Sequence, residues 1–177
     1  SSMYEESRRF VEDVLWTRSQ PLSELLTSRK SFVDPTLAKL YGVPYPGKDK
    51  EFAAVELGPE RSGLLTQASV LTVLSRTEKT SVVARGLFVR GSMLCLPKIS
   101  SPPASVQAEI NAQLADDASE RELAAYRAQT SPCKSCHAQF DRLGLLLEGF
   151  DALGRHTKAN EQPVDLTGLG MFEGTVA

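Results

Sequence analysis

The sequence predicts an all-α fold with long loops, and three observations carry this prediction. Apolar residues recur at helical intervals over several stretches of the chain, as on the buried face of an amphipathic helix. Helix-starting signals precede some of these stretches, and segments rich in proline and glycine separate them. The chain has 177 residues, of which 41% are hydrophobic, so it is long enough to enclose a core.

Short helices are expected over the first 95 residues. The apolar spacing predicts helices over residues 4–17, 22–28, 65–75 and 81–95. Asp34 followed by Pro35 is the pattern of an N-cap and a first helical position, and Gly42 is expected to end this further helix. Residues 51–57 fit either a short strand or an extended connector, and both interpretations stay open.

The second half begins with a loop and then returns to helices. Three prolines make residues 96–104 a stiff and largely extended loop. Residues 106–114 follow with an apolar side chain at every fourth position. Ser119 and Glu122 form a capping-box pattern, which predicts a helix that runs to about Gln129.

The charge and hydropathy of the chain argue against two kinds of partner. The net charge of −2 at pH 7 gives no electrostatic case for binding nucleic acid or an anionic membrane surface. No apolar run reaches the roughly 18 residues needed to span a bilayer, so no transmembrane segment is expected in this chain.

The pentapeptide at 133–137 is the strongest functional signal, and it has the pattern CxxCH. Cys133 and Cys136 are one helical turn apart, which suits two thioether bonds to the two vinyl groups of one haem. His137 would then bind the haem iron through an imidazole nitrogen. The chain has only three cysteines and two histidines, and the motif contains three of these five residues. The sequence therefore predicts one covalently attached haem c, with the apolar residues of 141–150 forming part of its wall.

The sixth ligand of the iron decides the chemistry, and the sequence leaves it open. Met171 is the first candidate, because it follows the motif in a glycine-rich loop. Met93, His156 and Cys95 are further candidates, and the sixth position could also lack a protein ligand. If Cys95 is not a ligand, we expect it to be a buried free thiol. A methionine ligand would suit electron transfer, whereas an open position would permit small-ligand binding or peroxide chemistry.

Arginines are the natural partners of the two haem propionates, because a guanidinium group binds a carboxylate with paired hydrogen bonds. Arg85 and Arg76 are the candidates for this role. Asp141, Glu148 and Asp151 are expected to cap helices or to pair with arginines. No acid–base machinery is evident, so an electron-transfer domain is favoured over an enzyme.

Several runs of residues carry a family resemblance: RSGLLT at 61–66, SRT at 75–77, TSVVARG at 80–86, CKSCH at 133–137, DRLG at 141–144 and LEGFDALGR at 147–155. They resemble a bacterial domain of unknown function that is abundant in planctomycetes and myxobacteria. There it occurs in large exported proteins with cytochrome-c-like modules. The resemblance implies a cytochrome-c-like helical domain over residues 60–155, and it does not name a substrate.

The flanking residues resemble other parts of such proteins. The run DPTLAKLYGVP at 34–44 is similar to the tail of a preceding domain, and the run from Pro163 to Gly168 to the start of a following one. The resemblance thus implies a helical tail over residues 1–59 and the start of a new segment over 156–177. We expect a larger multidomain protein, exported to the periplasm or the cell surface, with a redox partner protein or domain.

Two other functions remain as alternatives. A zinc-stabilised structural domain would use a Cys₃His donor set made of Cys95, Cys133, Cys136 and His137. Because His137 directly follows Cys136, it is difficult for both side chains to bind the same zinc ion. The second alternative is a haem enzyme or sensor whose sixth position is open.

Overall fold

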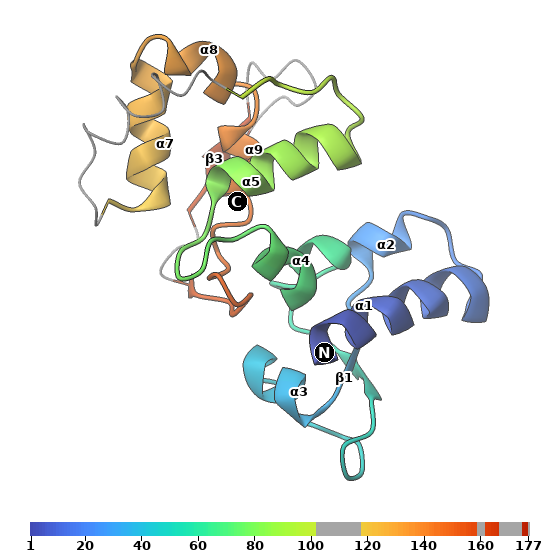
Figure 1. Ribbon diagram of the computed structural model, residues 1–177. Helices are drawn as coiled ribbons and strands as arrows, with labels where there is room; N and C mark the ends of the chain where they lie inside the picture. Colours follow the sequence, from blue (N-terminus) through green and yellow to red (C-terminus); the bar gives the residue numbers. More distant parts are fainter. Residues whose placement is uncertain (102–117, 159–161, 167–174, 177) are drawn as a thin grey trace. The chain divides into compact units, whose positions relative to one another are not determined.

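The computed structural model describes residues 1–101, 118–158, 162–166 and 175–176 (Figure 1). The stretch at 106–114 lies outside the described residues. The chain forms two compact units, which are considered separately: unit 1 comprises residues 1–79 and 149–160, and unit 2 comprises residues 80–148 and 161–177. The sequence domains expected over 1–59, 60–155 and 156–177 do not coincide with these units, and their boundaries stay a prediction.

Unit 1 is mostly helical, as expected. The first predicted helix runs as α1 and continues directly into one turn of π-helix, η1. The helices expected over 22–28 and 65–75 are present but shorter than expected, whereas the helix after Asp34 ends at Gly42 as expected. The helical segments of unit 1 are α1 (Ser2–Glu12), η1 (Asp13–Thr17), α2 (Glu24–Thr27), α3 (Pro35–Tyr41), the 3₁₀ turn η2 (Leu64–Thr66) and α4 (Ala68–Val73).

The N-cap and the end of α3 follow the sequence signals closely. The side chain of Asp34 accepts a hydrogen bond from the backbone N–H of Leu37 at 2.9 Å, and Pro35 is the first helical residue. Gly42 ends the helix in the left-handed region with φ 69°, where a side chain would be strained. Both signals were predicted correctly because they depend on contacts within one or two turns of the chain.

An antiparallel pair of strands in unit 1 corrects the all-α prediction. Strand β1 (Lys30–Val33) pairs with β2 (Ala53–Glu56), with Lys30 opposite Glu56. This assigns the ambiguous segment 51–57 to a strand. The sequence does not signal β1, because one of its two inward positions is Ser31 rather than an apolar residue.

Ser31 is buried because it has a partner on α1. Its hydroxyl donates a hydrogen bond of 2.7 Å to Glu6, and the hydroxyl of Tyr41 donates another of 2.6 Å to the same carboxyl group. Glu6 is itself fully buried. Burial raises the pKa of Glu6 to about 7, although both hydrogen bonds act in the opposite direction.

Arg61 is a buried cation in the same unit, with only 1% of the residue exposed. Its guanidinium carbon lies 4.1 Å from the ring centroid of Tyr41 and 4.7 Å from that of Phe150, so it contacts two aromatic rings. The guanidinium also donates hydrogen bonds to the carbonyl oxygens of Thr66 and Gly154. Burial lowers the pKa of Arg61 from its ordinary value.

Unit 2 holds the motif, and the described part of it is built mainly from short helical segments. They are α5 (Val82–Phe88), the π-helical turn η3 (Val89–Met93), α7 (Glu120–Gln129), α8 (Cys133–His137) and α9 (Asp141–Leu145). The predicted capping box opens α7, since Ser119 and Glu122 bond reciprocally. A second short ladder, β3 (Val164–Asp165) with β4 (Thr175–Val176), is a further departure from all-α.

Two sets of contacts hold α9 in its position within unit 2. It packs extensively against α5, and the Arg85 guanidinium of α5 is fully buried beside the residues that follow α9. Within the described ranges, no helix has the length and apolar character needed to cross a membrane.

Candidate functional site

The CxxCH motif folds as the single helical segment α8, as its spacing predicts. Cys133 is buried and Cys136 is exposed, and both are free thiols. The helix places the two cysteines three positions apart, so they are neighbours across one turn. His137 is the last residue of this segment, with 17% of its side chain exposed.

His137 is held by a carboxylate from the start of α9. Its Nδ1 lies 3.0 Å from Oδ1 of Asp141, while Oδ2 of Asp141 accepts a hydrogen bond of 2.8 Å from Nε of Arg127. Only 8% of the Asp141 side chain and 7% of the Arg127 side chain are exposed. With Nδ1 engaged, Nε2 is the nitrogen of His137 that can bind a metal ion.

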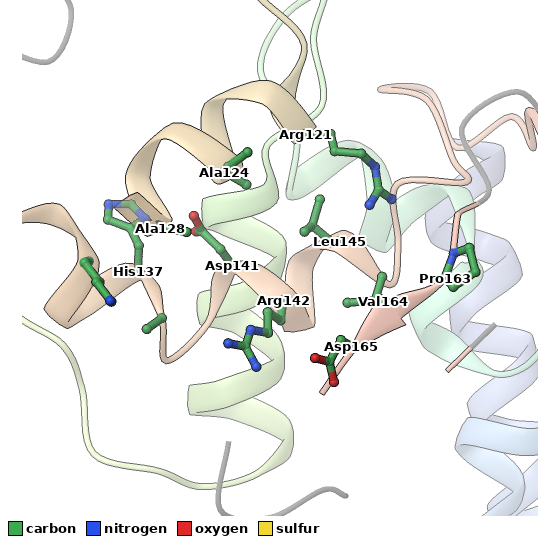
Figure 2. A pocket seen from close by; sticks show the side chains of 13 residues that line it. Arg121, Ala124, Ala128, His137, Asp141, Arg142, Leu145, Pro163, Val164 and Asp165 are labelled. Carbon is green, nitrogen blue, oxygen red and sulfur yellow. Dashed lines mark hydrogen bonds and ion pairs between the residues drawn. The ribbon is translucent and has the colours of Figure 1, made fainter. Parts of the chain in front are cut away.

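A cavity of about 340 Å³ lies beside this group (Figure 2). His137 and Asp141 line it from one side, as Figure 2 shows. Its apolar lining includes Ala124 of α7, Leu145 of α9 and Val164 of β3. An apolar lining with a few polar groups is typical of a site for a small molecule or cofactor.

Cationic side chains also line the cavity: Arg121, Lys134 and Arg142. The Nη2 nitrogen of Arg121 is buried and has no hydrogen-bond partner among the residues that the structure describes. A buried guanidinium nitrogen without a partner is costly, and a carboxylate would satisfy it. Asp165 is an acidic residue in the same lining.

The two arginines expected to bind propionates lie elsewhere. Arg85 is completely buried, and its Nη1 donates hydrogen bonds to the carbonyl oxygen of Leu147 at 2.6 Å and to Glu148 at 3.2 Å. Burial raises the pKa of Glu148, and Arg85 opposes this effect. Arg76 is an exposed residue of unit 1. Neither arginine lines the cavity, and their role towards a propionate stays a prediction.

The candidates for a sixth ligand are scattered along the chain. Met93 ends η3 and is 40% exposed. Cys95 is exposed, so the expectation of a buried thiol is wrong; its backbone φ of 53° lies in the left-handed region, outside regular helix. His156 belongs to unit 1, where its ring lies 5.4 Å from that of Phe150. Met171 falls outside the described residues.

The zinc alternative needs four donors in one place. Among the residues that the structure describes, which include all four of them, no group of three or more His, Cys, Asp or Glu side chains is arranged to hold a metal ion. The Cys₃His site is therefore not formed in this fold.

Sequence reasoning gave Asp141, Glu148 and Asp151 the correct kind of partner. Each pairs with an arginine: Asp141 with Arg127, Glu148 with Arg85, and Asp151 with Arg155. It missed the bond from Asp141 to His137, for which the available signal was their spacing of four residues. It also missed Arg121, which no local pattern distinguishes from a surface arginine.

The donor set on α8 is of the kind that covalent haem attachment uses, although neither Cys133 nor Cys136 lines the cavity. The donor set contains two free thiols one turn apart and an imidazole with one nitrogen engaged. Arg121 lines the same cavity as His137, and its unpartnered Nη2 suits a carboxylate group.

Two family models match the chain. One is described as PSCyt3, protein of unknown function (DUF1588), and it matches residues 61–160, more than half of the chain. The other is described as PSD4, protein of unknown function (DUF1592), and it matches residues 1–43. Nothing among curated proteins or solved structures matches the chain. These matches confirm the expected resemblance to a family of unknown function.

Proposed function

Because the chain belongs to the PSCyt3 family, protein of unknown function (DUF1588), we propose that it is a c-type cytochrome module carrying one covalently attached haem. The family name points to a cytochrome-like module. The observation that carries the proposal is the turn of α8, which presents two free thiols and an imidazole in the order of a haem attachment site.

Four residues have roles in this proposal. Cys133 and Cys136 would form the two thioether bonds, and His137 would bind the iron through Nε2 because Asp141 occupies Nδ1. Arg121 would bind a propionate, since its Nη2 is buried without a partner among the described residues. The bound haem would supply a one-electron couple, which suits electron transfer.

Met171 remains the first candidate for the sixth ligand, with Met93, His156 and Cys95 behind it. A thioether ligand would close the iron to small molecules and would suit a module that only passes electrons. An open position would instead favour a haem enzyme or sensor.

The module is proposed to work outside the cytoplasm, within a larger protein and with a redox partner. In bacteria, haem is attached covalently after export. The succession of two family matches along one chain supports a multidomain parent. Cell fractionation of the full-length protein tests this, and recovery in the cytoplasm would contradict it.

The cofactor is tested by producing the chain together with the haem-attachment machinery. We expect an intact mass that corresponds to one added haem, together with the pyridine haemochrome spectrum of a c-type haem. Cys133→Ser and Cys136→Ser should each lose a thioether bond, whereas Cys95→Ser is the matched control and should retain full attachment. A colourless protein with the mass of the bare chain would overturn the proposal.

The sixth ligand is tested by absorption spectra of Met171→Ala and of Met93→Ala, the other methionine candidate, with Met3→Ala as the control. Loss of the methionine–iron band in Met171→Ala alone would support Met171. Unchanged spectra would exclude it. Carbon monoxide binding by the reduced wild-type protein would favour the open-site alternative.

A further inference from the structure

The ion pair between Arg127 and Asp141 determines which nitrogen of His137 carries the ring proton. A guanidinium group has only donors, so Arg127 takes one acceptor oxygen of Asp141. The other carboxylate oxygen is also only an acceptor, so its hydrogen bond with His137 requires the proton on Nδ1. The lone pair then resides on Nε2, the nitrogen that is free to bind a metal ion.

The fold leaves this carboxylate little freedom to turn away. Asp141 is the first residue of α9, which packs against α5. Arg127 lies on α7, whose start is fixed by the capping box of Ser119 and Glu122. Both members of the ion pair are buried, so water does not replace either partner.

We infer that Asp141 and Arg127 are positioning residues, which keep His137 in its Nδ1–H tautomer and so reserve Nε2 for the haem iron. This inference rests on the proposed haem function. It adds a property of the haem: a carboxylate behind the imidazole makes the ligand a stronger electron donor to the iron, which stabilises ferric iron and lowers the midpoint potential. The positive charge of Arg127 limits this effect.

Asp141→Asn tests the inference with almost no change in shape. Arg127 still requires an acceptor, so the carbonyl oxygen of Asn faces Arg127 and its amide N–H faces His137. Nδ1 must then accept a hydrogen bond, which moves the ring proton to Nε2. We expect ¹⁵N NMR of the haem-free chain at pH 8 to show the Nδ1–H tautomer in the wild type and the Nε2–H tautomer in Asp141→Asn.

A double variant and a control sharpen this test. Adding Arg127→Met to Asp141→Asn removes the demand for an acceptor, so the amide can turn and the Nδ1–H tautomer should return. Asp13→Asn makes the same change at a buried carboxylate of unit 1 that likewise accepts hydrogen bonds from two side chains, Arg18 and Lys30. It should leave the tautomer of His137 unchanged.

The haem-loaded protein gives the second readout. Asp141→Asn should raise the midpoint potential relative to the wild type, and Asp13→Asn should not change it. If the wild-type chain carries the ring proton of His137 on Nε2, the inference is wrong. It is also wrong if Asp141→Asn changes neither the tautomer of His137 nor the midpoint potential of the haem. A chain that shows the tautomer switch but never binds haem overturns the proposed function while supporting the tautomer assignment.

Discussion

Gly86 of α5 and Gly144 of α9 bring the backbones of the two helices into direct contact. A Cβ atom added to Gly86 would lie 3.2 Å from the backbone nitrogen of Gly144, and one added to Gly144 would lie 3.0 Å from that of Gly86. Each would also collide with a backbone carbonyl oxygen, of Phe140 and Val82 respectively. Neither helix can accept a side chain here, so the contact fixes α9 and, with it, Asp141.

Alanine at either glycine is therefore expected to destabilise unit 2 strongly. Because the obstructing atoms are backbone, the helices must separate, and we expect a loss of at least about 2 kcal/mol in the free energy of unfolding. Urea denaturation measures it. Gly91→Ala is the control, since nothing lies within 4 Å of its added Cβ; equal stability of Gly86→Ala and Gly91→Ala would contradict the prediction.

Arg61→Lys should destabilise unit 1 by about 3 kcal/mol. The substitution retains the charge, but it removes the planar group that contacts Tyr41 and Phe150 and one of the two carbonyl hydrogen bonds. Denaturant unfolding checks the value. Arg155→Lys, at a guanidinium with 59% of its side chain exposed, serves as the control and should change stability by less than about 1 kcal/mol.

Glu6 should make the stability of the protein fall as the pH rises from about 5 to about 7. The folded protein keeps the Glu6 proton up to a pKa of about 7, whereas the unfolded chain releases it near 4.5. The folded state therefore binds more protons over this interval, so the free energy of unfolding decreases with pH and then levels off. Relative to Glu6→Gln, the wild type should lose about 2 kcal/mol between pH 5 and pH 8.

Chemical denaturation at several pH values measures this difference for Glu6. Glu12→Gln changes an exposed carboxyl group on the same helix and should retain the wild-type slope. A Glu6→Gln variant whose stability follows the wild-type profile would show that the buried carboxyl group does not control it.

Ser119→Ala should lower stability by about 1 kcal/mol, because it removes the acceptor for the backbone N–H of Glu122 at the start of α7. Thermal unfolding followed by circular dichroism gives the shift. Ser135→Ala is a suitable control, since Ser135 is exposed and its hydroxyl accepts no backbone N–H at a helix start; it donates to the carbonyl oxygen of Pro132 and lies 4.0 Å from the sulfur of Cys136. A larger loss from Ser135→Ala than from Ser119→Ala would contradict the assignment.

Short-range signals made much of the fold and part of the site predictable. The caps at Asp34 and Ser119 were correct because each bonds a residue three positions away. The helical turn at the motif was correct for the same reason. The first strand was missed, because its inward Ser31 is acceptable only in the presence of Glu6, twenty-five residues away. The pattern of polar and apolar residues within a strand of four residues cannot show that a distant side chain will bond to Ser31.

The sequence by itself determined the CxxCH motif, its helical turn and the arginine partners expected for Asp141, Glu148 and Asp151. Only the tertiary structure decided that Asp141 joins Arg127 to His137, that Arg121 faces a cavity and that Arg61 is buried between aromatic residues. The physical reason is range. Helical turns and caps are closed by hydrogen bonds over three or four residues, whereas a buried charge is stable only where distant parts of the chain supply its partners.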